Sequence, residues 1–341
     1  MKQFFNIDLH ISVIADIKDI FKRIDKNINI TDWSLSGHSW VFNKNQKKLE
    51  IINGRTWINM NTEVIDKFIE KYDDIFKTFD AFICCHPNSF VLFFEKYNKP
   101  IYIINSCRYD LPFCWTNNHD MINKLNNCFT RLQNKSLLTF ISNNKADNAY
   151  FKLANPTIET KMLPSLCLYT KMTWNPLNTC DKFLLYSGNI DINHNVIHRS
   201  KLGKYNWNVL MRFKGIIHFP YEASTMSIFE QISSEIPLFF PSKKFLKYLW
   251  ENKIIHHQMN YWKHYKNCSS PECLKQTENL DFWINKADYY DLKGYYYFDS
   301  FENLKQLLDN FTDSEYITRK QFIKERKENT IDSYKTILTN H

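Results

Sequence analysis

The segment 214–242, KGIIHFPYEASTMSIFEQISSEIPLFFPS, constrains the fold of this chain more than any other part of the sequence. An apolar strand runs into a polar loop with Glu222, and hydroxyl side chains then open a short helix that carries Glu230. The helix ends before Pro237, which introduces a second apolar strand over 238–240. A strand, a helix and a further strand in so short a segment predict one βα unit of a parallel sheet.

The two glutamates lie where a strand becomes a helix, which is the edge at which parallel α/β sheets bind ligands. A helix N-terminus presents unpaired N–H groups and a positive dipole end, so it favours a diphosphate. Glu230 is then placed to accept hydrogen bonds from both hydroxyls of a ribose, and Glu222 to reach a sugar beyond the diphosphate. Ser227-x-x-Glu230 also fits a capping box, which needs no ligand. The residues alone favour neither interpretation.

The segment resembles the nucleotide-sugar motif of the retaining glycosyltransferases of GT-B fold, E-x(7)-E followed by a small residue, G-x-P and a strand. Glu222 and Glu230 match the two acids, and Glu235 stands in place of the glycine before Ile236-Pro237. The resemblance implies an α/β chain with two Rossmann-like domains, whose parallel sheets face an interdomain cleft. It also implies that Glu230 binds the donor ribose and that Glu222 faces the donor sugar.

Composition excludes several classes of protein. An apolar fraction of 44% and an aromatic fraction of 16% are incompatible with a disordered chain. The sequence has no run of 18 apolar residues and no signal-peptide pattern, so no transmembrane segment is expected. Nine irregularly spaced cysteines indicate reduced thiols and a cytoplasmic protein. The net charge of +8 suits anionic ligands and leaves a peripheral membrane contact open, but no nucleic-acid-binding signature accompanies it.

Alternating strands and helices predict two domains. Residues 1–170 are expected to form a Rossmann-like acceptor-side domain, and residues 171–320 a Rossmann-like nucleotide-sugar domain. Residues 321–341 are expected to form a C-terminal helix, which the family would carry back to the first domain. Predicted strands of the first domain are 4–9, 29–33, 79–84, 100–104 and 137–141, and predicted helices are 12–24, 62–78, 88–96 and 144–153. The hinge between the domains is expected near 163–179, and it contains a strand-like segment at 165–169.

Polar groups follow three of these strands. His10 follows the first strand, His86 the third, and Arg108 with Asp110 the fourth. Because the carboxyl ends of parallel strands meet at one edge, we expect these loops to converge and to hold an acceptor beside a general base or a transition-state hydrogen-bond donor. Polar residues at such positions, Asp8 among them, also serve as ordinary helix caps.

A glycine and several basic residues complete the expected donor site. Gly188 follows the first strand of the second domain, and arginine and lysine suit phosphate oxygens, although each one alone also fits solvated surface charge. The predicted donor-binding residues are Glu230, Ser224, Thr225, Met226, Ser227, Gly188, Arg199, Lys201, Lys214 and Tyr221. The predicted catalytic residues are Glu222, His86, Arg108, Asp110 and His10.

Neither a metal nor a cofactor is expected. The aromatic-rich segment 256–297 contains five side chains that could ligate zinc, but their spacing matches no zinc-ligand pattern. These residues are His256, His257, His264, Cys268 and Cys273.

These features predict a metal-independent hexosyl- or pentosyltransferase of glycan biosynthesis, which moves a sugar from a nucleotide-diphosphate donor to a glycan or other acceptor. Retention of anomeric configuration is implied by the resemblance only, since Asp8 or Asp110 could act as the base of an inverting reaction. A GT-B nucleotide-sugar epimerase or phosphorylase and a non-catalytic nucleotide-sugar-binding protein stay open as alternatives. The sequence identifies neither the sugar, the nucleotide, the acceptor nor the oligomeric state.

Overall fold

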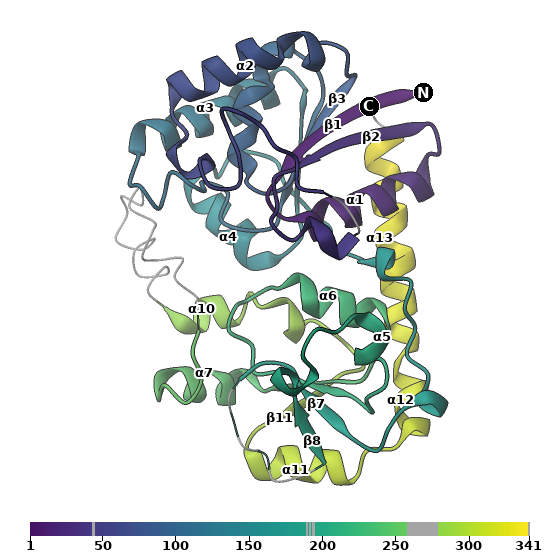
Figure 1. Cartoon of the computed structure of the whole chain (residues 1–341). Helices are drawn as coiled ribbons and strands as arrows, with labels where there is room; N and C mark the ends of the chain where they lie inside the picture. Colours follow the sequence, from purple (N-terminus) through teal and green to yellow (C-terminus); the bar gives the residue numbers. More distant parts are fainter. Residues whose placement is uncertain (43–44, 189, 191, 193–194, 258–278, 340–341) are drawn as a thin grey trace. The chain divides into compact units, whose positions relative to one another are not determined.

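The computed structural model describes all residues except 43–44, 189, 191, 193–194, 258–278 and 340–341 (Figure 1). The described chain divides into two compact units. Unit 1 contains residues 1–165 and 333–339, and unit 2 contains residues 166–257 and 279–332. The last helix, α13 (Gln321–Thr339), contributes residues to both units.

Unit 1 is built on a six-stranded parallel sheet with the order β2-β1-β3-β4-β5-β6. Its strands are β1 (Lys2–Asp8), β2 (Ile28–Ser34), β3 (Ala81–Cys84), β4 (Ile101–Asn105), β5 (Leu138–Ser142) and β6 (Lys161–Met162). Strands β3 and β4 are buried along their whole length, which explains why they read as continuous apolar runs. The strand order reverses between β1 and β3, and doubly wound sheets bind ligands at such a point.

Four α-helices of unit 1 connect these strands, and three of them begin at an asparagine cap. Asn61, Asn118 and Asn144 each accept a hydrogen bond from the backbone N–H three residues further on. The helices are α1 (Ile11–Ile24), α2 (Thr62–Phe76), α3 (His119–Asn134) and α4 (Lys145–Ala154). The short 3-10 helices are η1 (Ser39–Phe42), η2 (Trp57–Asn59), η3 (Asn88–Phe93) and η4 (Glu95–Tyr97).

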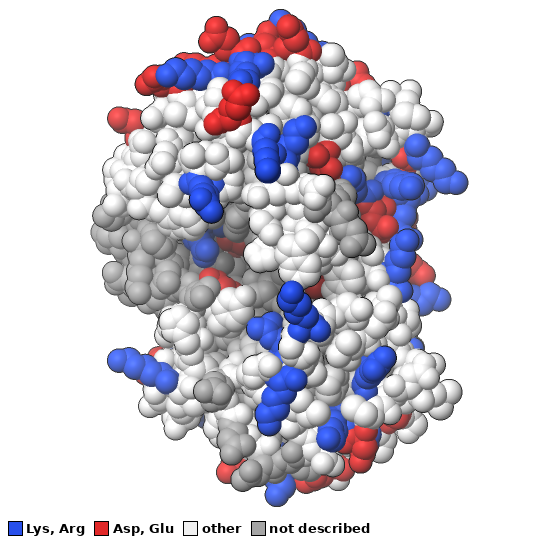
Figure 2. Space-filling model, viewed as in Figure 1, with Lys and Arg blue, Asp and Glu red and all other residues white. Residues whose placement is uncertain are grey.

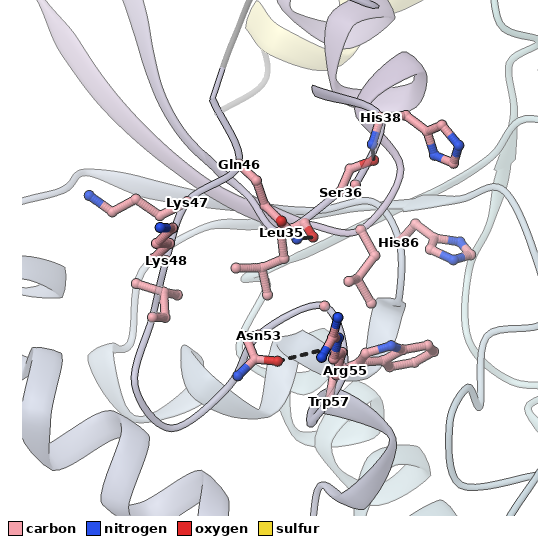
Figure 3. Close-up of a pocket in the computed structure, with 14 residues that line it drawn as sticks. Leu35, Ser36, His38, Gln46, Lys47, Lys48, Asn53, Arg55, Trp57 and His86 are labelled. Carbon is pink, nitrogen blue, oxygen red and sulfur yellow. Dashed lines mark hydrogen bonds between the residues drawn. The ribbon is translucent and has the colours of Figure 1, made fainter. Parts of the chain in front are cut away.

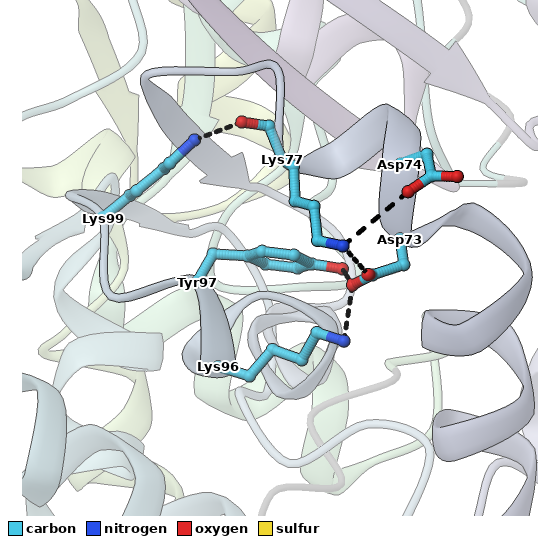
Figure 4. Close-up of polar contacts among 6 residues, drawn as sticks. All are labelled: Asp73, Asp74, Lys77, Lys96, Tyr97 and Lys99. Atoms are coloured by element: carbon cyan, nitrogen blue, oxygen red, sulfur yellow. Dashed lines mark hydrogen bonds and ion pairs between the residues drawn. The ribbon is translucent and has the colours of Figure 1, made fainter.

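An ionic cluster holds η4 against the end of α2 (Figure 4). Asp73 accepts a hydrogen bond from the hydroxyl of Tyr97 at 2.9 Å and forms ion pairs with Lys77 and with Lys96, the latter at 2.5 Å. These partners hold the pKa of Asp73 well below its usual range, with the hydrogen bond from Lys77 as the largest contribution.

Acidic and basic side chains alternate over α2 (Figure 2). Lys67 pairs with Glu63 at 2.6 Å, one helical turn away, and Lys71 pairs with Glu50. The lysines of this helix therefore have acidic partners and mark an ordinary solvated surface.

Unit 2 is built on a five-stranded parallel sheet with the order β11-β10-β9-β7-β8. Its strands are β7 (Phe183–Leu185), β8 (Val196–His198), β9 (Ile216–Ile217), β10 (Leu238–Pro241) and β11 (Tyr296–Phe298). Its α-helices are α5 (Trp207–Leu210), α6 (Met226–Ser233), α7 (Lys243–Glu251), α10 (Leu280–Ile284), α11 (Phe301–Asp309), α12 (Asp313–Arg319) and most of α13. Its 3-10 helices are η5 (Leu168–Thr170), η6 (Pro176–Asn178), η7 (Arg199–Leu202) and η8 (Asp288–Tyr290). The order reverses between β7 and β9, as it does between β1 and β3 in unit 1.

The prediction of an α/β chain with two parallel, Rossmann-like sheets is confirmed. The predicted strand at 165–169 is wrong, because Cys167 adopts a left-handed φ of 50° and the chain enters the 3-10 helix η5. The predicted helix at 88–96 consists instead of the two 3-10 helices η3 and η4.

Candidate functional site

Glu230 lies in the second turn of α6, where side chains from two other elements hold its carboxylate. The hydroxyl of Tyr169 donates to Oε1 at 2.5 Å, and Nε1 of Trp207 donates to Oε2 at 3.1 Å. Burial raises the pKa of Glu230, and these two hydrogen bonds oppose part of that rise. A carboxylate accepts about four hydrogen bonds, so two lone pairs remain for a ligand.

The start of α6 is not a capping box. Thr225 is the N-cap residue and its side chain makes no capping hydrogen bond, while Ser227 is already the second helical residue. The Glu230 carboxylate bonds Tyr169 and Trp207 instead of reaching back to a backbone N–H. The capping-box alternative is therefore wrong. The Thr225 and Ser227 hydroxyls contact each other at 3.2 Å, and the side chains of Ser224 and Met226 beside them are half-buried.

The ends of β7 and β9 are joined at the reversal point of unit 2. Ser187 Oγ donates to the carbonyl of Phe219 at 3.1 Å and accepts from the Phe219 N–H at 3.2 Å. Gly188 has a φ of +91°, and a Cβ there would lie 3.0 Å from Cβ of Phe219. Only glycine fits a positive φ and so close an approach without strain.

Arg199 is a predicted phosphate-binding residue that contacts these strand ends. Its guanidinium lies 4.6 Å from the ring centre of Tyr186, which follows β7. The same charge acts on His218 at the end of β9. The pKa of this imidazole is lowered to about 4, mainly by burial, with Arg199 adding to the shift and the hydrogen bond with Gln231 opposing it. His218 is 2% exposed and its Nε2 lies 2.5 Å from Oε1 of Gln231, which fixes α6 to β9.

The remaining predicted donor residues differ in their exposure and in their place relative to Arg199 and Gly188. Lys201 belongs to η7 with Arg199 and is exposed, and Tyr221 is 41% exposed. Glu222 is half-buried and its backbone carbonyl accepts a hydrogen bond from the Tyr289 hydroxyl at 3.3 Å. Lys214 is not part of the group, because it precedes β9 and pairs with Asp181 at the amino edge of the sheet.

Glu235 adopts a left-handed backbone conformation, which favours glycine. Its φ is 61°, and it follows the last turn of α6. The carboxylate is tied to α13 by Lys327, whose ammonium donates to it at 2.8 Å and to the carbonyl of Ser233 at 2.7 Å. These two bonds offset the strain of a left-handed glutamate.

In unit 1, three of the predicted loops converge. The rings of His10 and His86 lie 5.7 Å apart, and His86 Nδ1 lies 2.9 Å from the Cys107 thiol, beside Arg108. The pKa of His86 is lowered to about 3, mainly by desolvation and to a smaller extent by the charges of His10 and Arg108. His86 is therefore a neutral imidazole near pH 7.

Asp110 follows the same strand as Arg108 but is turned into the core. Its side chain is 2% exposed and accepts a hydrogen bond from the Tyr150 hydroxyl at 2.9 Å. Burial raises the pKa of Asp110 to about 6. Asp8 is likewise fully buried and accepts a hydrogen bond from the Asn6 side chain at 3.0 Å.

A pocket of about 710 Å³ opens at the carboxyl ends of β1, β2 and β3 (Figure 3). Leu9 and His86 line it at the reversal point of the sheet, and the loop after β2 supplies the other walls. The basic and aromatic residues of this loop were not predicted as site residues, because the loop has no periodic pattern and matches no motif. They are Lys47, Lys48, Arg55 and Trp57.

Among the described residues, no group of three His, Cys, Asp or Glu side chains could hold a metal ion. Three of the five side chains considered as zinc ligands, those of His264, Cys268 and Cys273, lie outside the described residues. Within the described part of the chain, no helix is long and apolar enough to cross a membrane.

No protein-family model and no curated protein matches this chain. The solved structures to which this chain is similar include three at 9% sequence identity. The glycosyltransferase SnogD from Streptomyces nogalater has a TM-score of 0.43, with 98% of this chain and 99% of its own covered. The glycosyltransferase of kitacinnamycin has a TM-score of 0.44 with 99% and 97% covered, and the calicheamicin glycosyltransferase CalG4 has 0.37 with 98% and 95% covered.

Proposed function

We propose that this protein is a glycosyltransferase that binds a nucleotide-diphosphate sugar on unit 2 and an acceptor on unit 1. The observation that carries the proposal is the carboxylate of Glu230, held by Tyr169 and Trp207 on the helix that follows the reversal point of the unit 2 sheet. A carboxylate with two remaining acceptor positions suits the two adjacent hydroxyls of a ribose.

The diphosphate is proposed to bind beside this carboxylate. The N-terminus of α6 offers unpaired N–H groups, and Arg199 supplies positive charge at the ends of β7 and β9. Gly188 keeps the intervening loop free of a side chain. Glu222, in the loop before α6, is proposed to face the donor sugar.

The reaction exchanges one glycosidic bond for another. The bond between the anomeric carbon and the diphosphate oxygen breaks, and a bond from that carbon to an acceptor hydroxyl oxygen forms. The nucleoside diphosphate leaves, and the hydroxyl proton passes to the leaving phosphate or to water. Arg199 and the α6 N-terminus stabilise the developing negative charge, so we propose a metal-independent reaction. Retention of anomeric configuration is carried over from the motif resemblance.

His86 is proposed to donate a hydrogen bond rather than to remove a proton. Burial raises the pKa of the Cys107 thiol, so the thiol stays protonated. It lies 2.9 Å from Nδ1 of His86 and 3.7 Å from the carbonyl of Arg108, and we propose that it donates to Nδ1, the shorter of the two contacts. The neutral ring then carries its own proton on Nε2, and its lowered pKa makes it a weak base. His86 can therefore orient an acceptor hydroxyl or stabilise charge on it, with Arg108 close by.

A thermal-shift screen with UDP-, GDP- and dTDP-sugars tests the proposal at its first step. One nucleotide class should raise the melting temperature, and Glu230→Gln should abolish most of that rise. Conversion of the donor into its epimer in the absence of an acceptor would favour the epimerase alternative. Binding of the donor without any turnover would favour a non-catalytic protein.

A further inference from the structure

The pocket of unit 1 is a basic site. Its fourteen lining residues include Lys47, Lys48 and Arg55 and no aspartate or glutamate. Cationic side chains gathered in one concave site without acids create a positive potential that concentrates anions. This composition differs from the surface of α2, where lysines have acidic partners.

Among the described residues, neither Lys47, Lys48 nor Arg55 forms an ion pair, and the ammonium of Lys47 lies 4.9 Å from the ring centre of Trp33. Figure 3 shows Arg55 beside Trp57, with Lys48 on a neighbouring stretch of the same loop. Their charge is therefore available to a ligand.

The loop that carries these residues is fastened to the sheet. The Gln46 side chain donates to the carbonyl of Leu35 at 2.5 Å, and the N–H of Lys47 donates to the carbonyl of Ser34 at 2.7 Å. A Cβ at Gly54 would lie 2.8 Å from the Leu35 oxygen, so glycine lets the chain next to Arg55 approach β2 closely. The basic residues are thus held at the carboxyl edge of the sheet beside His86.

We propose that this pocket binds the acceptor through an oxyanion, a phosphate or a carboxylate carried by a sugar. Lys48 and Arg55 contact the anion, Lys47 adds to the local potential, and Trp57, which is 8% exposed, closes the apolar part of the wall. His86 at the opposite wall then meets a hydroxyl of the same ligand. This inference rests on the proposed function, because it names the chemical class of the acceptor.

Calorimetry with glucose 1-phosphate, glucuronic acid and glucose tests the inference directly. The phosphate and the carboxylate should each bind at least about tenfold more tightly than the neutral sugar, and the two arms tell which oxyanion fits better. Binding of the anions should weaken with ionic strength. Equal affinity for glucose, or no binding of either anion up to about 10 mM, overturns the inference.

Variants assign the effect to the pocket. Lys48→Gln with Arg55→Gln should lower anion affinity at least about tenfold, whereas affinity for glucose should not change. Lys26→Gln is the matched control, because Lys26 is exposed and lies before β2, at the amino edge of the sheet. Both pocket residues are exposed, so circular dichroism melting should show all variants folded. Retained anion affinity in the double variant contradicts the assignment.

The inference and the proposed function can fail separately. If the anions bind in the pocket but no nucleotide sugar is turned over, the anion site stands and the transferase proposal fails. If transfer occurs equally well to neutral and anionic acceptors, the transferase stands and the anion site is wrong.

Discussion

The hydrogen bonds around Glu230 allow its structural role to be separated from its proposed ligand role. Tyr169→Phe removes the donor at 2.5 Å but keeps the carboxylate and its bond to Trp207. Glu230→Gln keeps the shape and removes the charge. Hydrogen bonds to charged groups contribute about 1.5–3 kcal/mol, and partial solvent access lowers this, so Tyr169→Phe should lose about 1–2 kcal/mol of unfolding free energy. Glu230→Gln should lose less, because burial disfavours the charged carboxylate that this variant removes. Because the two groups share one bond, the double variant should lose less than the sum.

The two variants should differ much more in their affinity for the nucleotide than in their free energy of unfolding. Glu230→Gln removes the charged acceptor of the ribose and should cost about 2 kcal/mol, or about thirtyfold in Kd. Tyr169→Phe leaves that acceptor in place and should cost less than about fivefold. Calorimetry with the preferred nucleoside diphosphate gives both values. Equal affinity for wild type and Glu230→Gln, or equal losses in both variants, would refute the ribose assignment.

Three further results are expected. Glu235→Ala should be less stable than Glu235→Gly by about 1 kcal/mol in urea unfolding, because both lose the bond to Lys327 and only glycine relieves the left-handed backbone; equal stability would remove the strain argument. His218 has a folded pKa of about 4, below the value of about 6.5 for an unfolded chain, so its stabilisation is complete above about pH 6.5 and falls as pH drops towards 4, by about 3 kcal/mol. His218→Gln should flatten this dependence in unfolding experiments at several pH values, and an unchanged slope would contradict the assignment. Donor turnover should survive dialysis against EDTA, and loss of activity that manganese or magnesium restores would overturn the metal-independent reaction.

The sequence predicted the central strands of both sheets, because buried parallel strands leave continuous apolar runs. It did not predict the short strands β6, β8 and β11, which have only two or three residues each. The strand ends Asp8, Cys84 and Asn105 mark the edge at which His10, His86 and Arg108 were expected, and the structure brings His10, His86 and Arg108 together. The burial of Asp110 could not be predicted. Whether its carboxylate faces solvent or accepts a hydrogen bond from the Tyr150 hydroxyl depends on packing between segments that are distant in the sequence.

Contacts between distant segments also explain what was missed around Glu230. Tyr169 lies in a segment that read as a strand, and Trp207 lies in a helix of only four residues, α5. Neither has a local pattern that ties it to a carboxylate. The pocket loop after β2 was missed for a related reason, since it lacks periodicity and is fixed by single bonds such as that from Gln46 to Leu35.

The most direct test of the transferase proposal follows both products of turnover with a panel of nucleotide sugars and sugar phosphate acceptors. We expect one donor to give nucleoside diphosphate and glycosylated acceptor in equal amounts. His86→Ala and Arg108→Ala should lower kcat while the donor Kd stays within about twofold, because both residues lie on unit 1 and the donor is proposed to bind unit 2. Full turnover in both variants, or loss of donor affinity as severe as in Glu230→Gln, would contradict this division of roles, and the absence of any product with every donor would contradict the proposed function itself.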